Sequence, residues 1–385
     1  MGIRALLEQL VAFDTTSRNS NLELIEFVRG ILDDQGIPSE LTFNRSGEKA
    51  NLWATIGPPD RPGVVLSGHT DVVPVDGQQW QSDPFSLLES GGKLFGRGTS
   101  DMKGFIAVCL ASIPKIKRCN PENPIHFAFS YDEEVGCIGV RELLKALSAF
   151  KIKPAMCLVG EPTDLRVIRG HKGGVGARCH FKGESCHSSQ THRGVNAIEM
   201  AAEGITYLKR MGMRFKEEGP FDHECTPPFT TIQTGLIEGG TALNIVPEHC
   251  SFEFEMRGIP SVNTLELADE FFTYCRSTLE PEMKKGSQQS GIDWEINSEY
   301  PPLDIDGESE AVKLLQKLTG ESTTGKVSFG TEAGLFQNEG IPAVVCGPGS
   351  IDQAHRPNEY ILINQLDRCE RLVDGVVQHF ARGAD

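Results

Sequence analysis

Short apolar segments alternate with amphipathic segments along the first part of the chain, and this alternation limits the fold more than any other feature. Strands are predicted at 51–57, 63–70, 124–131 and 155–162, which are apolar and bounded by turn residues. Helices are predicted at 24–36, 104–116 and 140–147, where apolar residues recur at helical spacing. Strands that alternate with helices are typical of an α/β domain with a mostly parallel central sheet.

The pattern changes after about residue 176. A strand with alternating polarity at 177–185 is followed by a helix at 196–211, two more strands and a helix at 263–277. This order predicts a small α+β sandwich. After the polar stretch KKGSQQSG the first pattern returns. We therefore expect a catalytic domain formed by residues 1–176 and 290–385, interrupted by an inserted α+β domain at residues 177–289.

Composition excludes several classes of partner. Asp and Glu total 53 against 37 Lys and Arg, and the net charge of -16 argues against a nucleic-acid partner. The sequence contains no run of about 18 apolar residues, so no membrane span is expected. The first residues lack a continuous signal-peptide core, and the 11 cysteines form no CxxC pair, so we expect reduced thiols in the cytoplasm.

Ionisable side chains follow the predicted strands of the first domain, which also include the segment 94–101 that ends at Asp101 and the segment 343–350 that precedes His355. In parallel α/β sheets, ligands bind beyond the carboxyl ends of the strands, so these side chains are expected to meet there. Carboxylates crowded together repel one another unless positive charge lies among them. Imidazoles with carboxylates suit two divalent ions such as Zn²⁺, Co²⁺ or Mn²⁺, of which we expect Zn²⁺ or Co²⁺. The residues concerned are His69, Asp71, Asp101, Glu133, Glu134, Glu161 and His355.

Each of these residues has a simpler structural interpretation when it is considered alone. A single histidine at a strand end is usually structural. The acids at 132–134 also fit a solvated turn before a helix, and Glu161 fits a turn before Pro162. The joint occurrence of all these residues in one domain favours a metal site.

Five motifs resemble the M20 family of di-metal aminoacylases and peptidases. They are SGHTDVVPV, GRGTSDMKG, SYDEEVGCIG, GEPT and AHRPNEY, in the family's order and over nearly the whole chain. The resemblance implies a phosphorylase/hydrolase-like catalytic domain with a mostly parallel sheet, plus an inserted lid and dimerisation domain. It also implies a homodimer.

The resemblance assigns the metal ligands by position. Asp101 would bridge the two ions. His69 and Glu161 would complete one ion's protein ligands, and Glu134 and His355 those of the other.

Two further roles follow from the same resemblance. Glu133 would be the general base and acid, taking a proton from water and passing it to the leaving amine. Asp71 would orient the His69 imidazole. The family also places a cis peptide bond after the bridging aspartate, here Asp101–Met102.

Substrate contacts are implied mainly in the inserted domain. His187 matches the family's histidine that donates to the oxyanion and acts in the partner subunit's site; the family's preceding glycine is Cys186 here. Asn244 and Arg257 match positions that hold the substrate carboxylate, although Arg257 could instead pair with an acid of the lid surface. In the segment GTEAG, Thr331 and Glu332 either begin a helix or reach the far end of the substrate.

The expected activity is metal-dependent hydrolysis of an N-acyl amino acid. The nearest likeness within the family deacetylates N2-acetyl-L-ornithine to L-ornithine and acetate, a step of arginine biosynthesis. The alternatives are hydrolysis of N-succinyl-diaminopimelate, of other N-acyl amino acids or of dipeptides. A non-catalytic binding relative and a thiol-dependent hydrolase using Cys186 are the alternatives from other classes.

Overall fold

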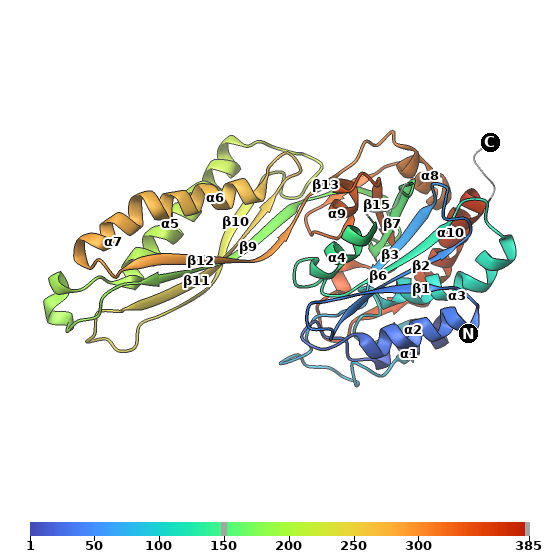
Figure 1. The fold of residues 1–385 in the computed structure, drawn as a ribbon, viewed down its shortest axis with the longest axis horizontal. Coiled ribbons are helices and arrows are strands. Elements are labelled where there is room, and N and C mark those ends of the chain that lie inside the picture. Colours follow the sequence, from blue (N-terminus) through green and yellow to red (C-terminus); the bar gives the residue numbers. More distant parts are fainter. Residues whose placement is uncertain (148–151, 382–385) are drawn as a thin grey trace. The chain divides into compact units, whose positions relative to one another are not determined.

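The computed structural model describes residues 1–147 and 152–381, which form two compact units. The larger unit contains Met1–Gly170, Leu303–Lys326 and the residues from Thr331 onward. The smaller unit contains His171–Pro302 and Val327–Gly330. Figure 1 labels the main helices and strands of both units.

A mixed sheet forms the centre of the larger unit, in the order β1-β2-β6-β3-β7-β15-β8-β13, with β14 paired to β8. The four middle strands β6, β3, β7 and β15 run parallel, whereas β1, β2 and β8 pair antiparallel with their neighbours. This confirms the predicted α/β class with a mostly parallel centre. The strands are β1 (Ser39–Phe43), β2 (Ala50–Ile56), β3 (Val64–His69), β6 (Ile125–Ser130), β7 (Met156–Pro162), β8 (Ile168–His171), β13 (Leu303–Asp304), β14 (Gly325–Val327) and β15 (Ala343–Gly347).

Helices cover both faces of this sheet (Figure 1). On one face, α3 packs so closely that a Cβ on Gly160 would lie 2.0 Å from the ring of Phe105. On the other face, the Ser67 and Ser130 hydroxyls reach Glu332 at the start of α9. The helices are α1 (Ile3–Ala12), α2 (Leu22–Asp34), α3 (Lys103–Cys119), α4 (Ile138–Leu147), α8 (Glu310–Thr319), α9 (Ala333–Asn338) and α10 (Ile363–Ala381), with a 3₁₀ turn at Ile351–Gln353.

A small antiparallel sheet corrects one expectation. The segment before Asp101 was expected to be a strand of the central sheet, but only Lys93–Phe95 (β5) is extended, and it pairs with β4 (Leu88–Ser90) and β16 (Tyr360–Leu362). The chain then turns through Gly98, whose φ of +81° favours glycine and ends extended structure. Asp101 therefore lies on a loop directly before α3.

The smaller unit is a four-stranded antiparallel sheet, in the order β10-β11-β9-β12, packed against helices. Along β11, Cys250, Phe252, Phe254 and Met256 are buried and alternate with more exposed residues, which is the pattern of a one-sided sheet. The elements are β9 (Gly173–Lys182), β10 (Thr231–Gly239), β11 (His249–Gly258), β12 (Gly291–Tyr300), α5 (Ala197–Glu218), α6 (Thr264–Tyr274) and α7 (Glu280–Gly286), with a 3₁₀ helix at Ser188–Arg193 and a π-helical turn at Cys275–Leu279.

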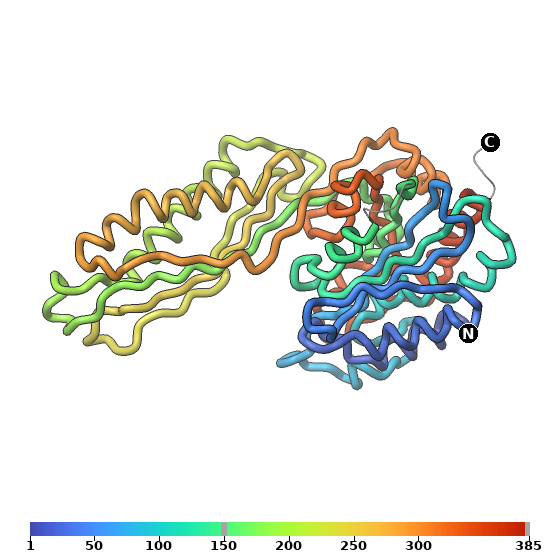
Figure 2. Tube along the Cα trace, in the orientation of Figure 1, coloured from blue at the N-terminus to red at the C-terminus, as the bar shows by residue number. Residues whose placement is uncertain are grey.

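The inserted unit is longer than expected at both ends. Figure 2 shows β9 and β12 side by side although they are far apart in the sequence. Because β12 completes this sheet by pairing with β9, the unit extends to Pro302 instead of ending at residue 289, and it begins at His171 instead of 177. Only Ile292 of β12 is fully buried, so the strand gives a weak apolar signal.

None of the helices in the described residues is long and apolar enough to cross a membrane. The eleven cysteines are all free thiols, and nine of them are buried.

Candidate metal centre

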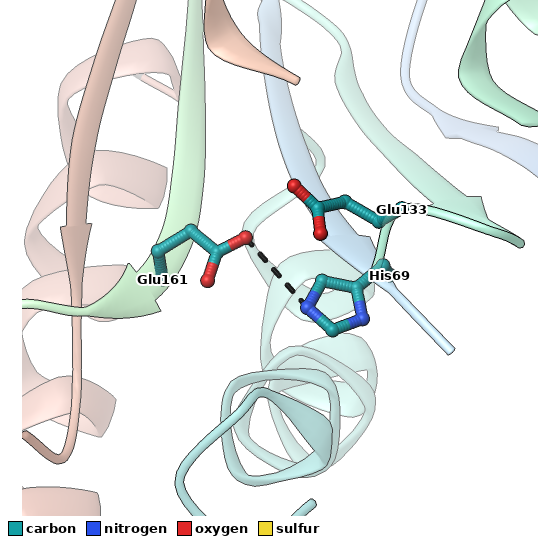
Figure 3. A group of neighbouring side chains, drawn as sticks. All are labelled: His69, Glu133 and Glu161. Carbon is teal, nitrogen blue, oxygen red and sulfur yellow. Dashed lines mark ion pairs between the residues drawn. The ribbon is translucent and has the colours of Figure 1, made fainter. Parts of the chain in front are cut away.

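Three parallel neighbours of the central sheet bring the first side chains together. His69 is the last residue of β3, and Glu133 and Glu134 follow β6, as the sequence predicts. Glu161 lies within β7, not after it. Figure 3 shows His69, Glu133 and Glu161 facing one another from these three elements. His355 lies on a loop after the 3₁₀ turn that follows β15.

The Asp101 carboxylate lies between two histidines. Its Oδ1 is 3.0 Å from Nε2 of His69, and its Oδ2 is 3.4 Å from Nε2 of His355. The carboxylate therefore presents one oxygen to each imidazole, the arrangement that a bridging ligand requires. The Asp101–Met102 peptide bond is cis, as the family resemblance implied.

Each histidine also faces a glutamate. Nε2 of His69 is 3.7 Å from Oε1 of Glu161, and Nε2 of His355 is 3.0 Å from Oε2 of Glu134. Two groups have ligand atoms that all lie within 4.8 Å of one another: His69, Glu133 and Glu161, and His69, Asp101 and Glu134. The structure thus brings together all five ligands expected from the sequence.

Two buried carboxylate oxygens at this point, Glu134 Oε1 and Glu161 Oε1, have no hydrogen-bond partner. An unpaired buried oxygen of this kind is costly unless a cation or a donor satisfies it. Imidazole nitrogens and carboxylate oxygens are the ligands that Zn²⁺ and Co²⁺ accept. The residues present therefore fit a pair of divalent ions.

The electrostatics of the cluster favour added positive charge. Burial and the neighbouring carboxylates raise the pKa of Glu133 to about 8, and burial and the charge of Asp101 raise the pKa of Glu134 to about 7. Burial also raises the pKa of Glu161 well above its usual value. Hydrogen bonds to Asp101 and Glu134 raise the pKa of His355 to about 10. Protons thus take up negative charge that bound cations would otherwise neutralise.

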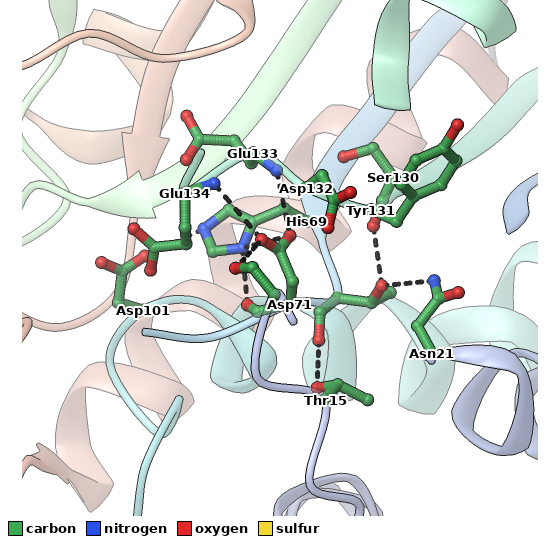
Figure 4. Close-up of polar contacts among 12 residues, drawn as sticks. Thr15, Asn21, His69, Asp71, Asp101, Ser130, Tyr131, Asp132, Glu133 and Glu134 are labelled. Carbon is green, nitrogen blue, oxygen red and sulfur yellow. Dashed lines mark hydrogen bonds and ion pairs between the residues drawn. The ribbon is translucent and has the colours of Figure 1, made fainter. Parts of the chain in front are cut away.

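Asp71 contacts His69 differently from what was expected. The closest partner of His69 Nδ1 is the main-chain oxygen of Asp71 at 2.9 Å, whereas the carboxylate Oδ1 is 3.6 Å away. The carboxylate instead accepts hydrogen bonds from the backbone N–H groups of Glu133 and Glu134 (Figure 4). It also accepts a hydrogen bond from the hydroxyl of Ser17. Asp71 therefore holds the loop of the two glutamates as well as the imidazole.

An ion pair at Asp132, the residue before Glu133, also holds this loop. Nζ of Lys49 lies 2.6 Å from Oδ1 of Asp132, and both side chains are only 14% exposed. Asp132 has a φ of +53°, an uncommon conformation for a residue other than glycine. The thiol of Cys137 lies 3.4 Å from Oε1 of Glu133. The ion pair thus holds the residue before Glu133, and the Cys137 thiol lies against the Glu133 carboxylate itself.

The segment GTEAG begins α9. Thr331 was one candidate for the cap of this helix, but Glu332 occupies the N-cap position, and Thr331, one residue earlier, accepts the N–H of Ala333 through its Oγ1. The buried Glu332 carboxylate accepts hydrogen bonds from Ser67 and Ser130 at 2.5 and 2.7 Å. Contact of Thr331 or Glu332 with substrate stays a prediction.

The remaining expected residues belong to the smaller unit. His187 is exposed, and its Nδ1 accepts the backbone N–H of Ser189, so a neutral ring carries its proton on Nε2. The main-chain oxygen of Asn244 accepts the N–H of Ser188, which places Asn244 beside His187. Arg257 on β11 forms an ion pair with Glu255 at 2.6 Å and reaches the main-chain oxygen of Ser328.

Several residues that support the site were not identified from the sequence. Glu359 and Arg97 form a fully buried ion pair beside Asp101, and Ser17 and Lys49 hold the Asp71 and Asp132 carboxylates. Arg97 and Glu359 lie within the motifs GRGTSDMKG and AHRPNEY, so those motifs contained a signal that went unused.

Comparison with protein families identifies the wider group. Residues 65–379 match the model of peptidase family M20/M25/M40. An acetylornithine deacetylase of Pasteurella multocida is 33% identical over 366 residues, covering 94% of this chain and 92% of that protein. An acetylornithine deacetylase of Yersinia pestis is 34% identical, covering 98% and 96%.

Solved structures agree on the fold. A tripeptidase from Staphylococcus aureus superposes with a TM-score of 0.77 at 20% identity, covering 99% of this chain and 98% of that chain. An M20 family metallo-carboxypeptidase from Sulfolobus solfataricus gives a TM-score of 0.76 at 17% identity, covering 98% and 99%. A Bacillus subtilis protein described as a dinuclear metal binding peptidase from the M20 family gives 0.65 at 14% identity, covering 99% and 98%.

Proposed function

Because the chain belongs to peptidase family M20/M25/M40, we propose that this amide hydrolase uses two divalent ions, Zn²⁺ or Co²⁺, to remove the acetyl group from N2-acetyl-L-ornithine. The observation that carries the two-metal part is the Asp101 carboxylate, which presents one oxygen to His69 and the other to His355. The names of the full-length relatives at 33–34% identity support the substrate.

Ions held by His69, Asp101, Glu161, Glu134 and His355 would polarise the amide carbonyl and make a bound water more acidic. Glu133 would accept a proton from the attacking water. It would then return this proton to the amine nitrogen as the C–N bond breaks. Its neighbours in the sequence are held by Asp71 and Lys49, so Glu133 would act from a fixed position.

The smaller unit would bind the rest of the substrate. His187 would donate from Nε2 to the carbonyl oxygen as negative charge develops on it, since its Nδ1 already accepts a backbone N–H. Arg257 and Asn244 would hold the substrate carboxylate. We further propose that the protein is a homodimer through this unit, with His187 acting in the partner's site, and that it works in cytoplasmic arginine biosynthesis.

A panel of amides tests the substrate assignment. We expect the highest kcat/KM for N2-acetyl-L-ornithine, because two relatives that are 33% and 34% identical over nearly the whole chain are named acetylornithine deacetylase. The panel also contains N-succinyl-diaminopimelate, other N-acetyl amino acids and dipeptides. A higher kcat/KM for any of these would replace the acetylornithine assignment and leave the family assignment intact.

The Arg257→Met substitution tests the carboxylate clamp. We expect kcat/KM to fall about 10- to 100-fold, mainly through KM, because a charge-assisted hydrogen bond contributes about 1.5–3 kcal/mol. Arg178→Met is the matched control, since Arg178 pairs with Glu253 in the same sheet. Steady-state kinetics of both variants decide the point, and an unchanged KM in Arg257→Met would exclude the clamp.

A further inference from the structure

The Glu359 carboxylate is completely buried and accepts four hydrogen bonds. Its Oε1 accepts the backbone N–H groups of Ser100 and Asp101, at 2.8 and 3.1 Å. Its Oε2 accepts the N–H of Gly98 at 2.9 Å and Nη1 of Arg97 at 2.8 Å. One carboxylate therefore holds nearly the whole loop between β5 and α3, including the backbone of the residue whose side chain faces both histidines.

The same pair of side chains also holds the loop that carries His355. Nη1 of Arg97 donates to the main-chain oxygen of Arg356 at 3.3 Å, and Nη2 donates to Oε1 of Gln78 at 2.7 Å. The amide of Gln78 in turn donates to the main-chain oxygen of His355 at 3.0 Å. Glu359, Arg97 and Gln78 thus connect the Asp101 loop to the His355 loop.

His355 needs this support more than the other histidine does. It has a φ of +62°, which is unfavourable for a residue other than glycine, and its side chain is 55% exposed. His69 ends a central strand and Glu161 lies within another, so the sheet itself holds both. The two proposed ions therefore differ in what keeps their ligands in place.

We propose that Glu359 is a positioning residue that, through Arg97 and Gln78, sets the Asp101 loop and the His355 loop in register and so determines how tightly the ion between Asp101, Glu134 and His355 is held. The inference rests on the two-metal site of the proposed function. An ion pair that only stabilised the fold would change the Kd of both ions equally, whereas a positioning role for Glu359 predicts a larger change for one ion.

Metal titration of the full chain tests this inference. Zn²⁺ is titrated into metal-free parent, Glu359→Gln and Gln78→Ala proteins against a chromophoric chelator. Asp304→Asn is the control, because Asp304 forms ion pairs with Arg169 and Lys326 in the same unit. Thermal unfolding of each metal-free protein measures any general loss of stability.

The parent is expected to bind two Zn²⁺ ions, and failure at that stage overturns the two-metal proposal itself. In Glu359→Gln we expect the Kd of one ion to rise about 10- to 100-fold, as is usual when a partner behind a metal ligand is lost, with a much smaller change for the other. The glutamine side chain would place an N–H₂ group opposite backbone N–H donors, so the loop would lose some of the hydrogen bonds that Glu359 accepts. Gln78→Ala is expected to weaken the same ion by less.

The inference is overturned if both Kd values of Glu359→Gln equal those of the parent. It is also overturned if both Kd values rise by the same factor. If Glu359→Gln does not fold, Gln78→Ala decides, and unchanged affinity for both ions in that variant overturns it.

Discussion

Glu133→Gln is expected to lower kcat by about 10²- to 10⁴-fold while the protein keeps both metal ions, because the substitution removes a proton acceptor without changing the size of the side chain. The structure supplies the reason to single out this residue. Burial and the surrounding carboxylates raise the pKa of Glu133 to about 8, so it holds a proton more readily than an ordinary carboxyl does.

Metal content is the essential second measurement in this experiment. The oxygens of Glu133 lie close enough to His69 and Glu161 for Glu133 itself to be a ligand (Figure 3). A base and a ligand predict different results: loss of the base leaves two ions in place, whereas loss of a ligand removes or weakens one. Single-turnover rates with measured metal content distinguish the two.

Glu142→Gln is the matched control, since Glu142 pairs with Lys145 on α4 of the same unit and its side chain is 46% exposed. We expect parental kcat and metal content in this variant. A kcat of Glu133→Gln close to that of the parent would remove Glu133 as the general base. Loss of metal together with activity would reassign it as a ligand.

Local sequence patterns predicted those parts of the site that are built by neighbouring parallel strands. His69 ends β3, and Glu133 and Glu134 follow β6, so their meeting follows from strand polarity alone. The same rule misplaced Asp101, which lies on a loop outside the central sheet. Strand-end reasoning therefore expected Asp101 near the other side chains for an incorrect reason, because a loop and not a strand end places it beside the two histidines.

The unpredicted part of the site depends on contacts between distant segments. Arg97 and Glu359 are 262 residues apart, and their ion pair fixes the loops of Asp101 and His355. A buried ion pair leaves no periodic pattern in the sequence, because either residue alone resembles a surface charge. The role of Asp71 beside His69 came from the family resemblance, and no pattern in the sequence indicated that its carboxylate also accepts the backbone N–H groups of Glu133 and Glu134.

The extent of the inserted unit was underestimated because its last strand has little to bury. β12 pairs along its length with β9, yet most of its side chains remain partly or fully exposed. Main-chain hydrogen bonds hold such a strand, and they leave no apolar signal to detect. β11 of the same sheet was predicted because its buried residues alternate clearly.

Removal of the metal ions is expected to abolish hydrolysis, and refilling with two equivalents of Zn²⁺ or Co²⁺ is expected to restore it. Without the ions, two carboxylate oxygens stay buried without a hydrogen-bond partner, and nothing polarises the amide. The melting temperature should rise with added metal, since a ligand bound only by the folded state stabilises it.

Metal binding should also release protons at pH 7. His355, with a pKa of about 10, holds a proton at that pH, and Glu134, with a pKa of about 7, holds one in part of the molecules. Both must lose it to bind an ion. Because their pKa values are raised in the metal-free protein, protons compete more strongly as the pH falls. The apparent Kd should then rise by about tenfold per pH unit for each proton displaced.

Calorimetric titration in buffers of different ionisation enthalpy measures the protons released, and the same titration at a lower pH measures the change in Kd. Iodoacetamide provides the opposing test, because a hydrolase that used the Cys186 thiol would be inactivated by it and would be indifferent to chelators. If metal-free protein kept its full kcat/KM and iodoacetamide inactivated it, Cys186 and not the carboxylate cluster would be assigned as the catalytic group. Loss of activity on chelation and recovery with the second equivalent would instead tie hydrolysis to both ions.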